Sequence, residues 1–363
     1  MTGPSASTWK QWPYSHPILV CEARSLSNLP IIGITMGDPA GIGPEIIVKA
    51  LADTNIYGLC RPVVLGDTEV LSAAILKYRQ NLHLHIISGP SEVRSIPDTI
   101  DHLAVSRLKA ETIFPGKPTV DGGKAMVASI IRAVDMTRKG EVEAMVTCPI
   151  SKILMHQAGY PYEGHTQLIS HLTHTHDYVM MLAGERLRVA LVTLHCPLKD
   201  VSAILDQERV YKTIIITAKA LKGHFGFKKP RLAVAALNPH AGESGLFGSE
   251  EEKIISPAIV RARDESYHVA GPFPADTLFH KAASGQFDAV VAMYHDQGLI
   301  PLKLLHFSDA VNVTLGLPII RTSVDHGTAY DIAGTGQADA ASLKAAIRLA
   351  VFMVKNSKTR RIG

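Results

Sequence analysis

DAVVAMYHDQGLIPLK, residues 288–303, joins an apolar, β-rich run to a polar tip. Its first seven residues, DAVVAMY, have the composition of a buried strand. His295 follows directly, and Asp296 and Gly298 come soon after it. A core strand that ends in this way delivers groups that titrate or bind metals to the edge of a sheet.

Two earlier runs have the same shape. Arg188–Leu194 (RVALVTL) is followed by His195, and Arg231–Leu237 (RLAVAAL) is followed by Asn238, Pro239 and His240. Each run is flanked by helical sequence, which predicts that the strands enter a sheet in parallel. Because ligand sites of open α/β sheets collect where parallel strands end, the three histidines could converge.

One histidine at a strand end is usually a hydrogen-bonded loop residue, so the metal hypothesis depends on there being three. Imidazole is the commonest metal-binding side chain near neutral pH. Three neutral imidazoles with an open position suit a catalytic Zn²⁺ or a similar transition ion, with bonds of about 2.0–2.1 Å. His195, His240 and His295 are therefore candidate metal ligands.

The rest of the chain alternates in the same manner, which predicts an α/β fold with a largely parallel sheet. The runs with strand composition are 31–35, 62–65, 82–87 and 144–147. The segments with helical spacing are 43–51, 68–78 and 122–138. Pro44 stands in the first turn of its helix, where a missing N–H costs little.

The length of 363 residues allows two domains, at roughly 100–200 residues each. The composition is 46% hydrophobic with a net charge of +4, and no basic block appears, which argues against a nucleic-acid partner. No apolar run approaches the ~20 residues that span a bilayer, so no membrane partner is expected. The four cysteines are scattered and lack a C-x-x-C pair, which favours a reducing cytoplasm.

Several polar residues suit a phosphorylated or carboxylated ligand. His165 and Thr166 stand in a turn, while Lys303 and Asn312 interrupt apolar sequence. Lysine supplies a point charge and arginine a planar fork for phosphate oxygens. Each basic residue alone is more often a surface charge, but Arg321 closes the apolar run LGLPII, where a charge needs a partner.

Nucleotide-binding glycine motifs are missing. The nearest stretch, Gly37–Glu45 (GDPAGIGPE), lacks the third glycine of G-x-G-x-x-G, and no P-loop occurs. The residues alone thus predict a two-domain α/β enzyme that uses a metal and an anionic small substrate.

These same regions resemble the 4-hydroxythreonine-4-phosphate dehydrogenase family of pyridoxal phosphate biosynthesis. The resemblance spans about residues 31–355 and rests on long motifs: ITMGDPAGIGPEI, EGHTQL, NPHAGESGLFGSEE, GPFPADTLF, AMYHDQGLIPLK and VNVTLGLPIIRTSVDHGTAYDIAGTGQAD. The family includes relatives that oxidise 4-phospho-D-threonate or 4-phospho-D-erythronate, which lack the amino group. It implies an isocitrate/isopropylmalate dehydrogenase-like fold of two lobes around a cleft.

The segment HGTAYDIAGTGQAD resembles the adenosine-binding loop of isopropylmalate and isocitrate dehydrogenases, which bind NAD without a Rossmann fingerprint. The resemblance implies cofactor contacts at His326, Gly327, Asp331 and Gly334. An acidic residue at the place of Asp331 accepts the ribose 2′-hydroxyl and repels a 2′-phosphate, so NAD is expected rather than NADP.

The family's metal ligands fall on His195, His240 and His295, and its substrate groups fall on five residues: His165, Thr166, Lys303, Asn312 and Arg321. Zinc is the favoured divalent ion, with cobalt, manganese or magnesium as alternatives. The family implies a homodimer with a shared active site, in which His295 would come from the neighbouring subunit.

The expected reaction is oxidation of a secondary alcohol by NAD, followed by decarboxylation of the β-keto acid. The metal would lower the pKa of the substrate hydroxyl. Asp276, Asp296 and Lys303 are candidates for proton transfer or for orienting a ligand. A phosphate acyltransferase-like enzyme and a non-catalytic metabolite-binding protein are the alternatives from other classes.

Three regions are expected along the chain. Residues 1–30 form an amino-terminal extension. Residues 31–150 together with 300–363 form an NAD-binding lobe, which is therefore discontinuous. Residues 151–299 form a metal-binding and dimerisation lobe.

Overall fold

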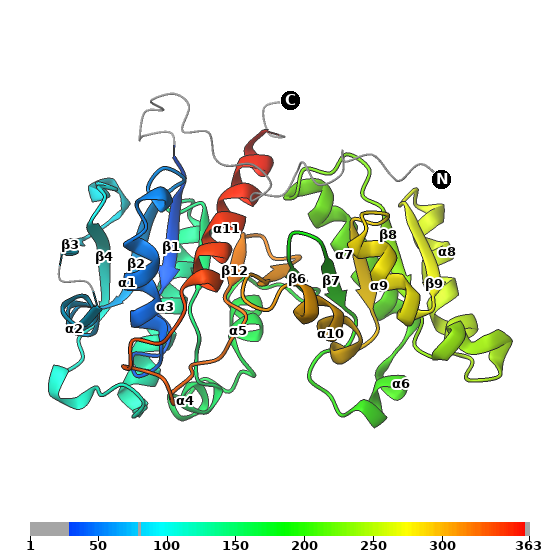
Figure 1. Cartoon of the computed structure of the whole chain (residues 1–363), viewed down its shortest axis with the longest axis horizontal. Helices are drawn as coiled ribbons and strands as arrows, with labels where there is room; N and C mark the ends of the chain where they lie inside the picture. Colours follow the sequence, from blue (N-terminus) through cyan, green and yellow to red (C-terminus); the bar gives the residue numbers. More distant parts are fainter. Residues whose placement is uncertain (1–28, 79–80, 360–363) are drawn as a thin grey trace. The chain divides into compact units, whose positions relative to one another are not determined.

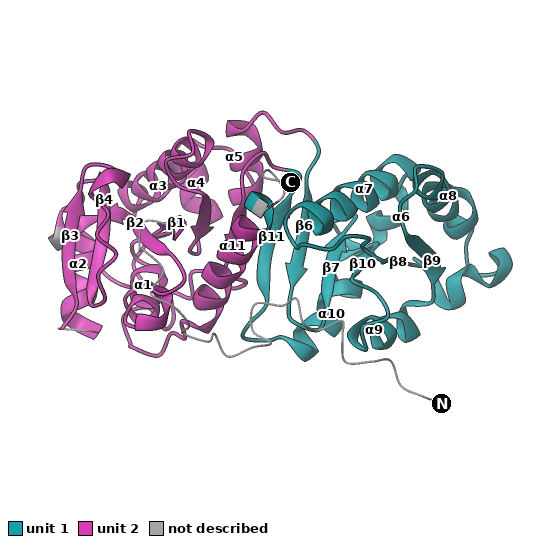
Figure 2. Ribbon diagram, turned by 90° about the horizontal axis from the view of Figure 1, so that it is seen from above, with its two compact units in different colours: residues 1–18, 177–316, 356–363 teal, residues 19–176, 317–355 magenta. Residues whose placement is uncertain are grey.

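The computed structural model describes residues 29–78 and 81–359, so residues 1–28 of the expected amino-terminal extension lie outside it. These residues form two compact units (Figures 1 and 2). Unit 2 holds residues 29–176 and 317–355, and unit 1 holds residues 177–316 and 356–359. The chain thus crosses between units at residues 176–177 and 316–317, and again at 355–356. The expected lobe borders lie near residues 150 and 300.

Unit 2 is built on a parallel sheet in the order β3-β4-β2-β1-β5-β12. Its strands are β1 (Ile31–Thr35), β2 (Arg61–Asp67), β3 (His83–Ile87), β4 (Thr99–Ser106), β5 (Ala144–Thr147) and β12 (Arg321–Ser323). Because all of these pairings are parallel, the loops that follow β1, β4, β5 and β12 leave the sheet at one edge.

Helices cover both faces of this sheet, with α1 and α3 on opposite sides of β1 in Figure 2. The helices are α1 (Gly43–Leu51), α2 (Thr68–Tyr78), α3 (Val120–Arg138), α4 (Lys152–Gln157), α5 (His165–Leu172) and α11 (Ala341–Thr359), whose last residues belong to unit 1. The hydroxyl of Thr119 accepts a hydrogen bond from Gly122 N at 3.1 Å and begins α3. Met126 and Ile130 of α3 are fully buried against the strands. Burial of one such side chain stabilises the fold by about 1.5–3 kcal/mol.

Unit 1 contains a mixed sheet in the order β11-β6-β7-β10-β8-β9. The strands are β6 (Val179–Ala183), β7 (Arg188–Leu191), β8 (Leu232–Ala235), β9 (Val269–Phe273), β10 (Ala289–Ala292) and β11 (Val311–Leu315). β6 pairs antiparallel with β7 and β11, while β10 pairs parallel with β7 and β8. The predicted α/β class with largely parallel sheets is therefore confirmed.

The helices of unit 1 also lie on two faces, with α9 and α10 opposite α7 and α8 in Figure 2. They are α6 (Val201–Ile204), α7 (Gln207–Gly223), α8 (Ser256–Asp264), α9 (Ala275–Ala283) and α10 (His295–Leu305). Leu278 and Leu302, from α9 and α10, are fully buried against the apolar side chains of β7, β8 and β10.

The placement of Arg321 differs from the sequence prediction. The expectation that it closes an apolar strand is wrong, because it is the first residue of β12. The run before it is interrupted by Gly316, whose φ of +90° ends β11, and by Pro318. The side chain is nevertheless almost fully buried, with 2% of its surface exposed.

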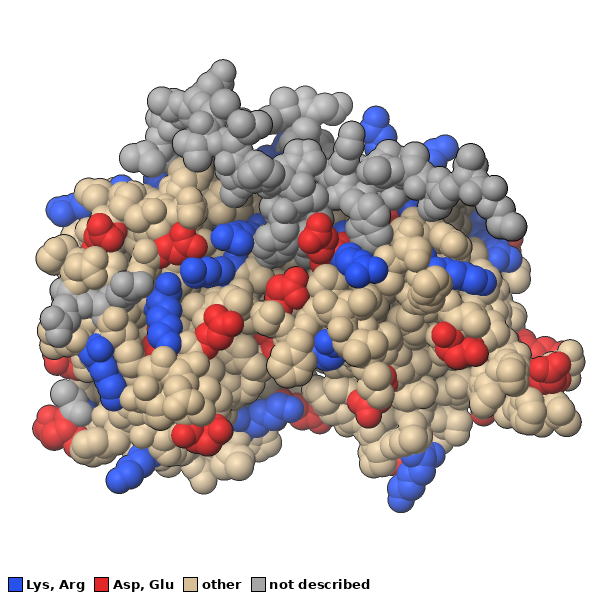
Figure 3. Space-filling view, viewed as in Figure 1, with Lys and Arg blue, Asp and Glu red and all other residues tan. Residues whose placement is uncertain are grey.

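The distribution of charged side chains on the surface is consistent with the small net charge of +4. Among the described residues visible in Figure 3, Lys and Arg side chains are interspersed with Asp and Glu. Cys60, Cys148 and Cys196 are free thiols. Of the helices within the described residues, none combines the length and the apolar composition needed to cross a bilayer.

Candidate active site

The three predicted histidine-bearing strands are neighbours. β10 lies between β7 and β8 and is parallel to both. Their carboxyl ends therefore share one edge of the unit 1 sheet, and His195, His295 and His240 all follow at that edge. The strands end earlier than predicted, at Leu191, Ala292 and Ala235, so each histidine stands on a short connection beyond the ladder.

His195 and His295 lie side by side. Beyond the two strands, Val192 N still donates to Ala292 O at 2.9 Å, and Thr193 N donates to Met293 O at 3.1 Å. The Thr193 hydroxyl donates to the same carbonyl at 2.8 Å. These bonds hold the two connections in register, and the imidazole centroids of the histidines are 5.6 Å apart.

Asp296 orients the imidazole of His295. The two side chains meet at 2.7 Å between Nδ1 and Oδ1. Because an ionised carboxylate only accepts, Nδ1 carries a proton, and in the neutral ring Nε2 is then the nitrogen with the lone pair. This is the tautomer that a metal ligand requires, and a carboxylate on the other ring nitrogen is its usual companion.

Gln297 ties the ends of β10 and β8 together, which the sequence did not reveal. Its side chain is buried; Oε1 accepts from Met293 N at 2.7 Å and Nε2 donates to Ala236 O at 2.6 Å. Both amide groups are used, so the rotamer is fixed. The available signal was an amide side chain in the first turn of a helix, two residues after His295.

His240 stands in the short turn η7 (Pro239–Gly245) after β8. Six consecutive residues, 240–245, have positive φ, with 52° at His240. This backbone is uncommon for non-glycine residues. The imidazole centroid lies 6.3 Å from that of the Phe247 ring.

Glu251 anchors the entry to this turn. Its buried carboxylate accepts hydrogen bonds from Leu237 N at 2.8 Å, Asn238 N at 2.7 Å and Asn238 Nδ2 at 3.0 Å. Sequence reasoning missed Glu251, because a carboxylate in GSEE looks like a solvated helix start.

The donor set fits a metal in part. Two imidazoles with centroids 5.6 Å apart can share one ion, and neutral nitrogen donors suit Zn²⁺. Within the described ranges, however, no three His, Cys, Asp or Glu side chains come close enough to hold an ion together. The structure thus brings together His195 and His295 and leaves His240 outside that pair.

The remaining candidates of unit 1 occupy three elements. Asp276 is exposed in the first turn of α9. Lys303 lies on α10, with Nζ 5.6 Å from the centroid of the Phe307 ring. Asn312 lies on β11 and directs Nδ2 to the sulfur of Met180 at 3.5 Å.

In unit 2, the buried Arg321 and the partly buried His165 form a cationic corner. His165 is the first residue of α5, beside Thr166, and its Nε2 is buried without a hydrogen-bond partner. Burial lowers the pKa of His165 well below its ordinary value, and the charge of Arg321 lowers it further. Burial lowers the pKa of Arg321 to about 9, so it stays charged at neutral pH. Its Nη2 donates to the hydroxyl of Thr147 at 2.8 Å.

This corner has the properties of an anion site. The first N–H groups of an α-helix lack intrahelical acceptors and carry a partial positive charge. At α5 they adjoin a buried guanidinium and an orphan imidazole nitrogen. An anion here would compensate a buried charge.

The expected cofactor residues lie on the irregular segment between β12 and α11, which leaves the carboxyl edge of the unit 2 sheet. His326 and Asp331 are exposed. A side chain on Gly327 would meet no atom within 4 Å. Gly334 has a φ of +81°, and a Cβ there would lie 2.6 Å from Pro115, so only glycine fits.

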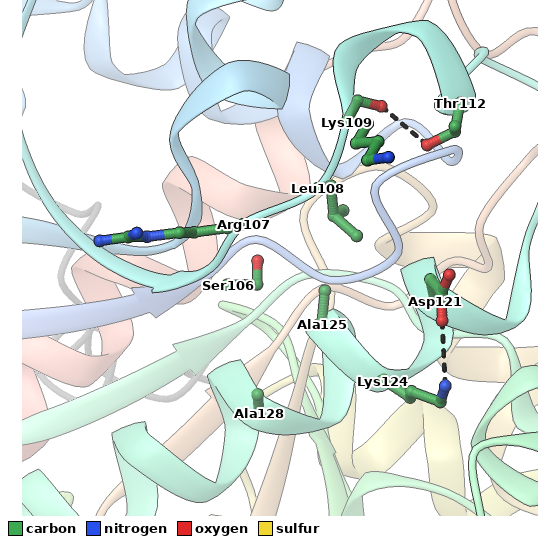
Figure 4. Close-up of a pocket in the computed structure, with 9 residues that line it drawn as sticks. All are labelled: Ser106, Arg107, Leu108, Lys109, Thr112, Asp121, Lys124, Ala125 and Ala128. Carbon is green, nitrogen blue, oxygen red and sulfur yellow. Dashed lines mark hydrogen bonds and ion pairs between the residues drawn. The ribbon is translucent and has the colours of Figure 1, made fainter.

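A separate cavity of about 540 Å³ also opens in unit 2 (Figure 4), beside the loop after β4 and the start of α3. It is lined by Ser106, Arg107, Leu108, Lys109, Thr112, Asp121, Lys124, Ala125 and Ala128. The charge of Lys124 is offset by Asp121 at 3.0 Å, and Arg107 extends away from the other labelled side chains. None of the residues that line this cavity was predicted from the sequence to be catalytic or to bind a substrate, cofactor or metal.

Comparison with known proteins gives consistent matches. Residues 58–350 match the family model described as pyridoxal phosphate biosynthetic protein PdxA. The chain is 54% identical to a 4-hydroxythreonine-4-phosphate dehydrogenase of Desulforapulum autotrophicum, over 93% of this chain and 99% of that protein. It is 46% identical to a D-threonate 4-phosphate dehydrogenase of Salmonella typhimurium, over 88% and 98%. A crystal structure of 4-hydroxythreonine-4-phosphate dehydrogenase from Klebsiella pneumoniae is 44% identical, with a TM-score of 0.84 over 90% of this chain and 98% of that one.

Proposed function

Because this chain belongs to the PdxA family and is an oxidoreductase of the dehydrogenase type, we propose that it oxidises the secondary alcohol of 4-hydroxythreonine 4-phosphate. A pyridine nucleotide, NAD, would accept the hydride when bound, and the β-keto acid product would lose CO₂. One divalent ion, preferably zinc, assists each site. The observation that carries the proposal is the pair of imidazoles, His195 and His295, at the edge shared by three parallel strands.

His195, His295 and His240 are the proposed metal ligands. The first two are neighbours, and the third follows the adjacent strand β8. When bound, the ion would lower the pKa of the substrate hydroxyl and the nicotinamide would take up the hydride. Asp296 keeps the proton on Nδ1 of His295 and so presents Nε2.

Proton transfer is assigned to two side chains of unit 1. The carboxylate of Asp276 and the Nζ of Lys303 are the proposed groups that accept and return the proton of the reacting hydroxyl. Asp276→Asn and Lys303→Met should each remove one limb of the pH–rate profile. Loss of the acidic limb would identify the replaced residue as the base, and loss of the basic limb would identify it as the acid.

The corner of His165, Thr166 and Arg321 is proposed to bind the substrate phosphate. Arg321 offers a planar fork, and α5 offers backbone N–H groups. Asn312 is proposed to orient the substrate. Nε2 of His165 is buried without a hydrogen-bond partner, so it is available to donate to a phosphate oxygen.

The nucleotide is proposed to lie on the loop of His326, Gly327, Asp331 and Gly334. Asp331 is exposed, as an acceptor for ribose hydroxyls must be. A carboxylate there repels a 2′-phosphate, so NAD should be used far better than NADP. A preference of tenfold or more for NADP would refute this assignment.

The second candidate substrate is 4-phospho-D-threonate or 4-phospho-D-erythronate, favoured by relatives at 46% identity that bear the D-threonate 4-phosphate dehydrogenase name. The residues named above recognise features that all these substrates share. The relative at 54% identity favours the amino-bearing substrate. NADH formation with 4-phosphohydroxythreonine and 4-phosphothreonate, measured in parallel, decides between them by kcat/KM. No turnover of either compound would refute both.

We also propose a homodimer that shares its active site and works in the cytoplasm. Ile300, Leu304 and Phe307, on α10 and just beyond it, expose 66%, 85% and 82% of their surface. Large apolar side chains grouped in this way mark association surfaces. α10 also carries His295 and Lys303, so a partner seated on this helix would lie against the site.

A further inference from the structure

The stretch Gly37–Lys49, GDPAGIGPEIIVK, has no part in the chemistry proposed above. It leaves β1 at the carboxyl edge of the unit 2 sheet and forms most of α1. Its glycines do not make a nucleotide fingerprint. In the structure it packs instead against the irregular segment Asp325–Ala340, the nucleotide loop, which belongs to the same unit.

The first half of the nucleotide loop is bound at two points. Ile42 N donates to Thr328 O at 3.0 Å, and the hydroxyl of Tyr330 donates to Oδ2 of Asp38. Asp38 is 1% exposed, and its Oδ1 accepts from Ala40 N at 2.9 Å. Burial, together with the bond to Asp38, raises the pKa of Tyr330 to about 12, so the phenol keeps the proton that it donates.

The second half is held by an ion pair. Glu45, 2% exposed, accepts from Ala338 N at 2.9 Å and from Lys49 Nζ at 2.8 Å. Lys49 Nζ also donates to Gly336 O at 2.6 Å and to Ala338 O at 2.7 Å. The ammonium group of Lys49 therefore donates to two carbonyl oxygens of the loop, and the carboxylate of Glu45 accepts from one N–H of the loop.

Close backbone approach is part of the same contact. A Cβ on Gly41 would lie 3.0 Å from Thr328 O, so the loop lies directly on this glycine. A third segment also joins, since Gly116 N donates to Ala40 O at 2.7 Å. The nucleotide loop contains no helix or strand, so these bonds provide partners for backbone groups that regular secondary structure would otherwise pair.

We propose that Asp38, Glu45 and Lys49 are positioning residues that fix the nucleotide loop in its binding shape before the nucleotide arrives. The role in binding rests on the proposed function, which assigns the nucleotide to this loop. Both oxygens of Asp38 are occupied and buried, so it shapes the site without touching the ligand. A preformed loop spares the nucleotide the entropy of ordering it.

The test uses Asp38→Asn, Tyr330→Phe and Lys49→Met in the full chain. Hydrogen exchange of residues 326–338 is measured without nucleotide, and NADH affinity is measured by fluorescence. We expect about tenfold faster exchange and about tenfold weaker NADH binding, the effect of losing one charged hydrogen bond. At saturating nucleotide, kcat should stay within about twofold.

Asp101→Asn is the matched control. Asp101 is equally buried in unit 2, and it accepts hydrogen bonds from Arg94 N, Ser95 N and His85 Nδ1. It should change neither the exchange of residues 326–338 nor NADH binding. Tyr330→Phe removes the same contact as Asp38→Asn from the other side, so it keeps the test open if one variant folds poorly.

Three outcomes are informative. Unchanged exchange of the loop in all three variants would overturn the positioning role. A fall in kcat with unchanged KM for the nucleotide would overturn it as well, because the residues would then act on the reaction itself. Faster exchange with unchanged NADH affinity would support the positioning role and refute the assignment of the nucleotide to this loop.

Discussion

The position of each of the three strand-end histidines is set by neighbouring residues. Asp296 fixes the tautomer of His295, while Thr193 and Met293 set the register between His195 and His295. His240 instead relies on a turn with unusual backbone angles. The pair and the single residue should therefore respond differently to substitution.

Replacing His240 with alanine should abolish turnover and lower the bound metal while leaving the fold intact. The side chain is exposed, so unfolding free energy should change by less than about 0.5 kcal/mol. Metal content by mass spectrometry, NADH formation and thermal unfolding check this. His83→Ala, at an exposed position of β3, is the control and should keep both metal and activity. A metal-free but fully active His240→Ala enzyme would refute the metal-centred scheme.

The buried His165 should make the protein less stable in mild acid. Its pKa in the folded chain is well below the ordinary value of about 6.5 that applies when it is unfolded. Below about pH 6.5 the unfolded chain therefore binds a proton that the folded chain does not. Stability falls with pH by up to about 1.4 kcal/mol per unit for this group.

Urea unfolding at pH 7 and pH 5.5, without substrate, measures that loss. His165→Asn should lose less stability between these two values than the unmodified protein. Ser170→Ala, on the same helix, removes no titrating group and should keep the unmodified slope. An equal loss in all three proteins would show that His165 does not carry the effect.

At the scale of elements, the turn η7 depends on one carboxylate. Glu251→Ala removes the acceptor of Leu237 N and Asn238 N. Two backbone donors without acceptors should lower the free energy of unfolding by about 2–4 kcal/mol. His240 should also be less well placed, so metal affinity should fall.

Glu252→Ala tests the specificity of that effect. Glu252 is exposed beside Glu251 on the short π-helix η8 (Glu251–Ile255), so its loss should cost less than about 0.5 kcal/mol. Urea denaturation and metal titration of both variants provide the comparison. If Glu251→Ala unfolds like Glu252→Ala, the anchor role is wrong.

Elements with strong periodicity were predictable from the sequence. The helices at 43–51 and 68–78 and the strands at 31–35 and 144–147 have the predicted bounds. Three similar runs also indicated that the strands now seen as β7, β8 and β10 are parallel and end at one edge, although their order in the sheet was not predicted. The spacing of apolar residues was sufficient to predict these elements, because each one buries either one face or all of its side chains.

Other features depend on partners distant in the chain, which local patterns do not encode. β4, β6, β9 and β11 were missed. β10 and β8 end early because the side chains of Gln297 and Glu251 accept the hydrogen bonds of Met293 N and Leu237 N just beyond them. Arg321 opens a strand because Gly316 turns the chain before it. The proximity of Asp38 to Tyr330 joins residues 292 positions apart.

At the scale of the molecule, the exposed apolar side chains of α10 should form the subunit contact. Leu304→Glu should convert the proposed dimer to a monomer, because a buried charge in an apolar interface is costly. Analytical ultracentrifugation measures the mass, and activity should fall with dissociation if the site is shared. Leu76→Glu, on α2 and 68% exposed, is the control and should leave the dimer intact. A dimeric Leu304→Glu protein would place the contact elsewhere.

The interleaved path of the chain has a consequence for biosynthesis. When residue 316 leaves the ribosome, every strand of unit 1 has been made, but unit 2 still lacks β12 and α11. Strand β5 must wait for β12, its partner along Met145–Thr147. The nested unit can therefore close its sheet first, although the synthesis of unit 2 begins earlier. During synthesis from the amino terminus, the strands of unit 1 are therefore complete before those of unit 2, although the first strand made belongs to unit 2.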